Sequence, residues 1–396
     1  MIQCGIRRNL RYPILFIVFT LIRRVIKFIM EYFFLKNVKL SYLTISFMIF
    51  FEFILGNIYS CIYQSIDSKD YKSKSKTKSD ANKKGINTIK IIENKNKVIK
   101  RPDHFRKIFL LMFFSAYFEF IGFLSRRLIT INDSNNNYDE FNAKYRSIEI
   151  LISSLLCYFT LRINIYRHHI FSLIIIIISL IIVFLYQFLN EFRHYKTFLY
   201  EILNVGITSI TRAFLDTTEK YLFDMDYINI FKLIRFQGFI NIILMSILYI
   251  FDKPRKEIIN LIKLSNDNYW HFWNPIIVVI LLIIYAILSG YKNIFRRYTI
   301  KEYSPMSRAL AESIIDPFLI ILGFIEDMPD DNFYISTITI CSVIMVFSSC
   351  VYNEVFILYC CKLEDNTYKE ISKRAKLNSI RNETLISITD KDEENN

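Results

Sequence analysis

Residues 168–190 read HHIFSLIIIIISLIIVFLYQFLN, a stretch of 23 residues that contains no Asp, Glu, Lys or Arg. An α-helix rises about 1.5 Å per residue, so a helix of this length crosses the hydrocarbon core of a bilayer, which is about 30 Å thick. Similar apolar stretches recur along the chain and are separated by short polar connectors. The sequence therefore predicts a membrane protein with several helical spans.

Ten such stretches are predicted to cross the membrane. The first contains Arg23, Arg24, Lys27 and Glu31, so an amphipathic helix at the membrane interface is the alternative interpretation of that segment. The predicted spans are residues 13–35, 42–64, 107–130, 141–162, 168–190, 197–218, 229–251, 270–291, 307–325 and 335–361.

The composition of the 396-residue chain agrees with this interpretation. Hydrophobic residues make up 53% of the chain and charged residues 22%, and most of the charge lies in the connectors. The net charge of +13 does not call for a nucleic-acid partner, because Lys and Arg on the cytosolic side of membrane helices account for it. None of the seven cysteines falls in a connector predicted to lie outside the cytosol, so no disulfide framework is expected.

Basic residues orient the chain, because Lys and Arg resist translocation and mark the cytosolic side. When the ten spans are numbered in order along the chain, the basic segments fall on one side of the membrane. These segments are the Lys-rich connector 65–106, the pair Arg296–Arg297 and residues 362–374. Acidic connectors around Asp133 and Asp330 fall on the opposite side. The sequence therefore predicts that both termini are cytosolic.

The predicted fold is all-α, with ten transmembrane helices in two inverted five-helix repeats. An odd number of spans in each half forces the second half to insert upside down relative to the first. Residues 1–190 would form the first repeat, with 65–106 as a disordered basic cytosolic loop that is too polar to bury. Residues 191–361 would form the second repeat, and 362–396 a polar cytosolic tail.

A local pattern is consistent with this symmetry. The predicted fourth span begins with YRSIE at residues 145–149, and the ninth begins with SRALAE at residues 307–312. Each carries an arginine and a glutamate about one turn apart. Coincidence is the alternative explanation. If the pattern reflects an inverted repeat, the two helix starts lie on opposite membrane faces.

Ionisable residues inside the predicted spans are the candidate functional residues, since each costs about 2.5–3.5 kcal/mol in the centre of a membrane helix. They would line a central polar cavity that binds a solute, or else form ion pairs that fix helix packing. Pro317 removes a backbone donor after Asp316 and predicts a break in the ninth span. The residues expected to contribute to the cavity are Glu52, Glu119, Arg146, Glu149, Arg308, Glu312 and Asp316.

Motifs of soluble enzymes and of ATP-driven pumps are missing from the sequence. The chain has no Gly-rich phosphate loop, no HExxH or CxxC motif, and no connector long enough for a nucleotide-binding domain. His168 and His169 are two adjacent histidines in a short turn, without a cluster of metal ligands around them in the sequence. We therefore expect no enzymatic activity, no cofactor and no metal, and any transport would be passive exchange or coupled to an ion gradient.

Residues 145–183 resemble a block of the drug/metabolite transporter superfamily, in which a small apolar helix ends in Phe-Leu-basic and a short turn leads into a long aliphatic helix. Phe159–Arg162 and the Arg167–His169 turn occupy these places. Residues 219–223 (EKYLF) and Gln237-Gly238 are similar to a Glu-Lys-aromatic block and a Glu-Gly pair of the solute carrier 35 members nearest the chloroquine-resistance-type transporters.

One further site agrees with the family pattern, and two sites depart from it. Phe51-Glu52 is similar to the Gly-Glu-Phe region of the same group. The glutamate of the Glu-Gly pair is Gln237 here, and glycines common in the fifth span are replaced by Phe171-Ser172. These two departures weaken any transfer of substrate or coupling from the family.

The resemblance implies a central cavity and secondary exchange or uniport of a small polar organic solute such as a nucleotide sugar, in a Golgi, ER, vacuolar or lysosomal membrane. The expected partners are the solute and the bilayer, without nucleic acid, in a monomer or a homodimer. Two other classes compete with a transporter. Complete pairing of the charges without a cavity would favour a scaffold or receptor, and polar clusters at one interface would favour a lipid-modifying enzyme.

Overall fold

The chain forms two compact units, which are described separately. Unit 1 comprises residues 1–11, 139–199 and 309–396, and unit 2 comprises residues 12–138 and 200–308. Each unit combines segments from both predicted halves of the chain. The computed structural model describes residues 2–4, 11–30, 41–81, 102–132, 145–163, 165–190, 195–250, 273–326 and 332–358, with positions 257, 259, 367, 370, 373 and 374. Almost all of the predicted tail lies outside these residues.

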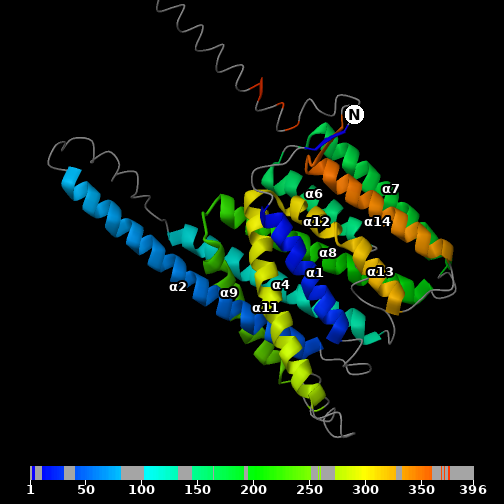
Figure 1. Cartoon of the computed structure of the whole chain (residues 1–396), viewed down its shortest axis with the longest axis horizontal. Helices are drawn as coiled ribbons and strands as arrows, with labels where there is room; N and C mark the ends of the chain where they lie inside the picture. The colour runs from blue at the N-terminus through cyan, green and yellow to red at the C-terminus, as the bar shows by residue number, and fades with distance from the viewer. Residues whose placement is uncertain are drawn as a thin grey trace, which may run out of the picture. The chain divides into compact units, whose positions relative to one another are not determined.

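Unit 1 is built around two long neighbouring helices, α7 (Arg167–Asn190) and α14 (Asn332–Tyr352), which lie side by side (Figure 1). The shorter helix α6 (Arg146–Leu161) packs on α7, and α13 (Asp316–Glu326) packs on α14. Each of these helices overlaps a segment predicted to span the membrane. The last part of α12 (Pro305–Ser313) also belongs to unit 1.

A two-stranded antiparallel ladder in unit 1 was not predicted from the sequence. β1 (Ile2–Cys4) pairs with β2 (Phe356–Leu358). The predicted tenth span, 335–361, is therefore too long as a helix, because α14 ends at Tyr352 and a turn with Glu354 at a φ of 56° leads into β2. An apolar run gives no sign that its last residues pair with a strand at the start of the chain.

Unit 2 contains most of the long helices. α2 (Ser41–Ala81) contacts both α9 (Ile230–Leu248) and α11 (Trp273–Glu302), and α9 also contacts α4 (Pro102–Asn132) (Figure 1). Unit 2 also contains α1 (Arg11–Ile29) and most of α8 (Tyr195–Asp224), of which residues 200–224 belong to this unit.

Two glycines allow α2 and α9 to approach closely. A Cβ atom on Gly238 would lie 3.0 Å from the Cα atom of Phe53, and one on Gly56 would lie 3.0 Å from the backbone nitrogen of Arg235. Both distances are shorter than ordinary van der Waals contacts to backbone atoms. Small residues at helix crossings are typical of membrane proteins, where close backbone packing holds helices together.

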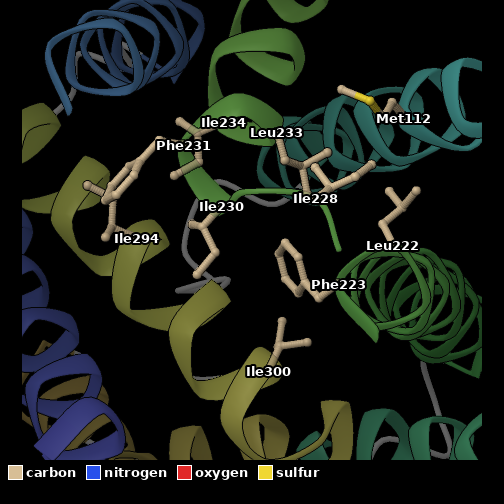
Figure 2. Close-up of a cluster of buried hydrophobic side chains, with 10 residues drawn as sticks. All are labelled: Met112, Leu222, Phe223, Ile228, Ile230, Phe231, Leu233, Ile234, Ile294 and Ile300. Atoms are coloured by element: carbon tan, nitrogen blue, oxygen red, sulfur yellow. The ribbon is translucent and has the colours of Figure 1, made fainter. Parts of the chain in front are cut away.

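The largest apolar cluster of unit 2 joins four helices and is shown in Figure 2. It packs α9 against α4, α8 and α11. These three helices also carry the buried charged residues Glu119, Glu219 and Arg297. The buried side chains are Met112, Leu222, Phe223, Ile228, Ile230, Phe231, Leu233, Ile234, Ile294 and Ile300.

In the part of the chain that the structure describes, five helices are long and apolar enough to cross a membrane, which is typical of an integral multi-pass membrane protein. They coincide with the second, third, fifth, seventh and eighth predicted spans. The ten crossings and the inverted repeat remain predictions. The five segments are Tyr42–Ile62 in α2, Arg106–Ser125 in α4, Arg167–Leu189 in α7, Ile230–Leu248 in α9 and Ile276–Glu302 in α11.

α1 turns its charged side into the protein and its apolar side outward. Thr20, Arg23 and Arg24 are buried, whereas Val18 and Ile22 are exposed. A helix at the membrane interface, which was the alternative interpretation of residues 13–35, would turn its charged side to water. α1 is not among the five candidate membrane-spanning helices found in the described residues, so the span over residues 13–35 and the interfacial helix both remain predictions.

α2 and α11 extend furthest beyond their predicted ends. α2 continues to Ala81, through residues 65–81 of the connector that was predicted to be disordered, because neither Gly nor Pro interrupts the chain between Gly56 and Gly85. Residues 82–101 of that connector lie outside the described residues. α11 continues to Glu302, so the arginine pair that was predicted to lie in a cytosolic connector is part of a helix.

Candidate functional site

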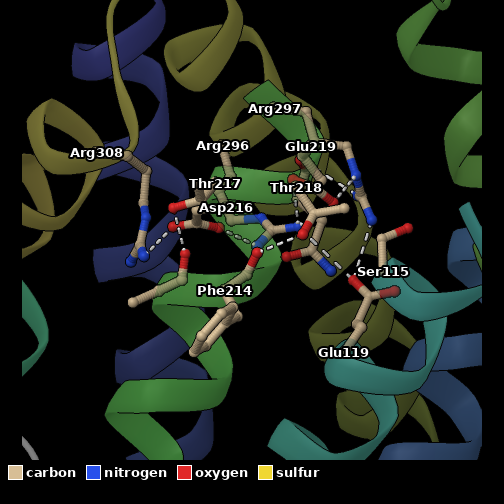
Figure 3. A network of polar contacts seen from close by, with 12 residues as sticks. Ser115, Glu119, Phe214, Asp216, Thr217, Thr218, Glu219, Arg296, Arg297 and Arg308 are labelled. Atoms are coloured by element: carbon tan, nitrogen blue, oxygen red, sulfur yellow. Dashed lines mark hydrogen bonds and ion pairs between the residues drawn. The ribbon is translucent and has the colours of Figure 1, made fainter. Parts of the chain in front are cut away.

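Buried charged residues of unit 2 form one connected group around Arg297, here called the Arg297 network (Figure 3). It contains three arginines and four carboxylates, contributed by five helices. The members are Glu52 of α2, Glu119 of α4, Asp216 and Glu219 of α8, Arg296 and Arg297 of α11, and Arg308 of α12.

Arg297 is the centre of this network, and its side chain is fully buried. Its Nη1 atom donates to Glu52 Oε1 at 2.7 Å, its Nη2 atom to Glu119 Oε1 at 3.0 Å, and its Nε atom to Glu219 Oε1 at 3.1 Å. The planar guanidinium group thus contacts three carboxylates in three directions. Charge-assisted hydrogen bonds of this kind are the strong ones in proteins, so Arg297 ties α11 to α2, α4 and α8.

Arg296 and Arg308 extend the network along α8. The Nη1 atom of Arg296 donates to Asp216 Oδ1 at 2.8 Å, and its Nη2 atom donates to Glu219 Oε1 at 2.9 Å. Arg308 forms an ion pair with the other oxygen of Asp216. Asp216 and Glu219 are three residues apart and therefore lie on the same face of α8.

Side-chain amides complete the hydrogen bonding of the carboxylates. Gln237 Nε2 donates to Glu219 Oε1 at 3.1 Å, and Asn241 Nδ2 donates to Glu119 Oε2 at 3.0 Å. Gln237 Oε1 also accepts from Arg297 Nη2 at 2.5 Å. A glutamate at position 237, as in the family that the sequence resembles, would place a further carboxylate against Glu219. The amide avoids that repulsion while it still accepts from the arginine.

Unit 1 holds a second buried group, here called the Arg146 network. Arg146 donates to Asp316 from Nη2 at 3.1 Å and from Nε at 3.3 Å, which is a bidentate contact. Its Nη1 atom lies 3.3 Å from Glu149 Oε2 and 3.3 Å from Glu312 Oε2. All four side chains are buried, and they come from α6, α12 and the start of α13.

The break between α12 and α13 places Asp316 beside Arg146. α12 ends at Ser313 and α13 begins at Asp316, so the predicted interruption next to Pro317 is confirmed. Proline is tolerated in the first turn of a helix because the backbone N–H that it lacks has no intrahelical partner there. The carboxylate of Asp316 also benefits from the partial positive charge at the start of α13.

All seven predicted site residues are buried, and they divide between the two networks. Arg146, Glu149, Glu312 and Asp316 belong to the Arg146 network, and Glu52, Glu119 and Arg308 to the Arg297 network. One expectation is wrong. The 3.3 Å ion pair between Arg146 and Glu312 does not fit helix starts on opposite faces of a bilayer, since the hydrocarbon core alone is about 30 Å thick.

Four network residues were missed in the sequence. Arg296 and Arg297 lie just beyond the end of the eighth predicted span, where a charge pair normally marks an exposed connector. Asp216 and Glu219 lie at and just beyond the end of a predicted span. The signal that could have found Asp216 and Glu219 is their spacing of three residues, which places both on one face of a helix that continues beyond the predicted span. The arginine pair 296–297 supplies the opposite charge. Glu219 was noted only as part of the family resemblance.

A small cavity lies in unit 1, with a volume of about 10 Å³, which is room for about one water molecule. It is lined by Ser147, Ser179, Val183, Ile320, Ile338, Cys341, Ser342 and Met345. Within the residues that the structure describes, no three His, Cys, Asp or Glu side chains are grouped in a way that could hold a metal ion.

Comparisons with known proteins add no relative. No protein family model matches the chain, and no curated protein matches it. The resemblance to the drug/metabolite transporter superfamily therefore remains a prediction. The chemistry of the site rests on the two networks, in which each central arginine contacts three carboxylates.

Proposed function

We propose that this protein is a secondary membrane transporter, an exchanger or uniporter of a small polar organic solute. The observation that carries the proposal is the way Arg297 is held. A fully buried guanidinium group, with carboxylates from three helices around it, lies among helices whose apolar sides face outward. Ionisable groups inside membrane proteins are costly and commonly mark the path of a solute or an ion.

The networks suggest how a solute would be bound. Its polar groups would replace one partner of a central arginine, and the displaced carboxylate would keep its amide donor, as Glu119 keeps Asn241. The interruption of the ninth predicted span supports the same function, because broken helices in transporters expose backbone groups and helix ends to the solute. The proposal also includes coupling to a proton gradient, an endomembrane location and cytosolic termini.

A scaffold or receptor without transport activity is the second candidate. It is favoured by the extensive pairing in the two networks, since Arg297 and Arg146 each contact three carboxylates. The small volume of the cavity in unit 1 favours it as well. Ion pairs of this kind would serve only to hold the helices in register.

A binding screen followed by an uptake assay separates the two candidates. The purified full-length protein is heated with nucleotide sugars, amino acids, peptides and organic acids, because a solute that binds the folded state raises the unfolding temperature. Each stabilising solute is then offered to proteoliposomes. We expect saturable uptake of at least one of them, and slower uptake with Glu312→Gln. Stabilisation without any uptake would favour the scaffold.

A further inference from the structure

Arg23 is a buried cation that belongs to neither network. It lies on the inward side of α1 with 2% of its surface exposed. Its guanidinium group sits over the ring of Tyr285 of α11, 5.4 Å from the ring centre. In the part of the chain that the structure describes, no carboxylate pairs with Arg23, and its buried Nε atom has no hydrogen-bond acceptor. Arg146 and Arg297, which are equally buried, each contact three carboxylates.

An arginine in this position needs a counter-ion. Arginine side chains carry a positive charge in proteins. The contact of Arg23 with the ring of Tyr285 offsets only part of the cost of burying a charge without a counter-ion. The simplest group that would satisfy Arg23 is an anion that arrives from outside the chain.

The neighbouring helix supplies further groups for such an anion. α1 and α11 run antiparallel along a shared seam, because Tyr12 stacks on Tyr298 with ring centres 4.8 Å apart at one end, and Arg23 reaches Tyr285 at the other. Between them, Lys292 Nζ lies 5.4 Å from the ring centre of Phe16. The seam therefore carries two buried cations, held by aromatic rings.

Ser289 shares a face of α11 with two residues of the seam. It is one helical turn from Tyr285 and from Lys292. Its hydroxyl group is buried and has no hydrogen-bond partner among the described residues. A buried hydroxyl without a partner is uncommon in native proteins, and a bound water or ion is one explanation for it. This observation is independent of the missing counter-ion of Arg23.

We infer that the seam between α1 and α11 binds an anionic group, a carboxylate or a phosphate, with Arg23 as the counter-ion and the Ser289 hydroxyl as a hydrogen-bond donor. Guanidinium groups bind both anions through two parallel hydrogen bonds. The anion is carried either by a water-soluble solute or by the headgroup of an anionic lipid. If it is a solute, the inference rests on the proposed transport function and narrows its substrates to organic anions.

The test uses the full-length protein in phosphatidylcholine nanodiscs. Thermal unfolding is followed with increasing sodium phosphate, with sodium chloride added to keep the ionic strength constant. We expect the unfolding temperature to rise saturably by about 2 °C or more. Arg23→Gln should abolish this response, and Arg23→Lys should retain part of it. Lys232→Gln removes one positive charge from an exposed position of α9 and should leave the response unchanged.

A second set of nanodiscs, containing phosphatidylglycerol, distinguishes the source of the anion. Stabilisation by phosphatidylglycerol that is lost in Arg23→Gln, without a response to phosphate, assigns the site to a lipid headgroup. The inference is overturned if neither probe stabilises the wild type, or if Arg23→Gln responds as the wild type does.

This result can be separated from the proposed function. Uptake of a solute together with an unresponsive Arg23 would refute the anion site and leave the transporter in place. A phosphate response that depends on Arg23, in a protein that transports none of the screened solutes, would support the anion site and count against the transporter.

Discussion

Arg297 donates to Glu52 at 2.7 Å, although the two residues are 245 positions apart in the chain. This hydrogen bond joins α11 to α2, and it belongs to a guanidinium group that also contacts Glu119 and Glu219. The long helices of unit 2 are therefore held together by a charge contact as well as by the apolar cluster of Figure 2.

Replacing the central arginine should be strongly destabilising. Arg297→Gln leaves Glu52, Glu119 and Glu219 without their shared cation, and breaking a buried ion pair on one side costs about 3–5 kcal/mol. Arg297→Lys should not restore stability, because an ammonium group cannot reach three carboxylates with the geometry of a planar fork. Thermal unfolding in detergent measures both variants. Wild-type stability in Arg297→Gln would show that the network contributes nothing to folding.

Neutralising one carboxylate of the Arg146 network should leave the protein folded. Glu312→Gln removes one of three acidic partners, and Arg146 keeps its bidentate contact with Asp316. We expect a loss of about 1 kcal/mol or less, compared with about 3–5 kcal/mol for Arg146→Gln. Because it folds, Glu312→Gln is suited to the uptake assay. A transporter should lose uptake in this variant, and undiminished uptake would remove Glu312 from the solute path.

The close approach of α2 and α9 predicts opposite results for two glycine substitutions. Gly238→Ala brings a Cβ atom to 3.0 Å from the backbone of Phe53 and should destabilise the protein by about 1–3 kcal/mol. Gly122→Ala in α4 has no atom within 4 Å of the new Cβ and should be neutral or stabilising by up to about 1 kcal/mol. Unfolding temperatures of the two variants test this. Equal values would argue against the helix crossing.

The orientation of α1 can be tested with spin labels attached to single cysteines. A label at Ile22, which is on the outward apolar side, should collide often with oxygen and rarely with a water-soluble nickel complex, as in lipid. A label at Thr20, on the inward side, should be protected from both reagents. Strong collision of the Thr20 label with the nickel complex would instead place the charged side in water, as in an interfacial helix.

The apolar runs of the sequence predict helices well, but they predict helix ends poorly. α7 begins one residue before the predicted span and ends with it, because residues 168–190 carry no charge and polar residues flank both ends. α11 exceeds its prediction because Arg296 and Arg297 have good helix propensity, and their partners lie on other helices. Charge near the end of a span was interpreted as contact with water, whereas these charges contact Glu52, Asp216 and Glu219.

The candidate residues could be selected from the sequence, but their grouping could not. Ionisable side chains within apolar helices must be buried among partners, and this rule alone selected Glu52, Glu119 and Glu312. Which arginine each one meets depends on helix packing. No spacing along the chain indicates that Arg146 meets Asp316, 170 residues later.

The three-part composition of unit 1 has a consequence for biosynthesis. Residues 2–4 leave the ribosome first, yet their strand partner at residues 356–358 is made only after all the helices have been synthesised. Arg146 is likewise synthesised long before Glu312 and Asp316, with only Glu149, one turn away, as an acidic partner. A nascent chain that is halted before α12 therefore carries this arginine with one of its three carboxylates, and the contacts that join α6 to α12 and α13 form only after the later segments have been made.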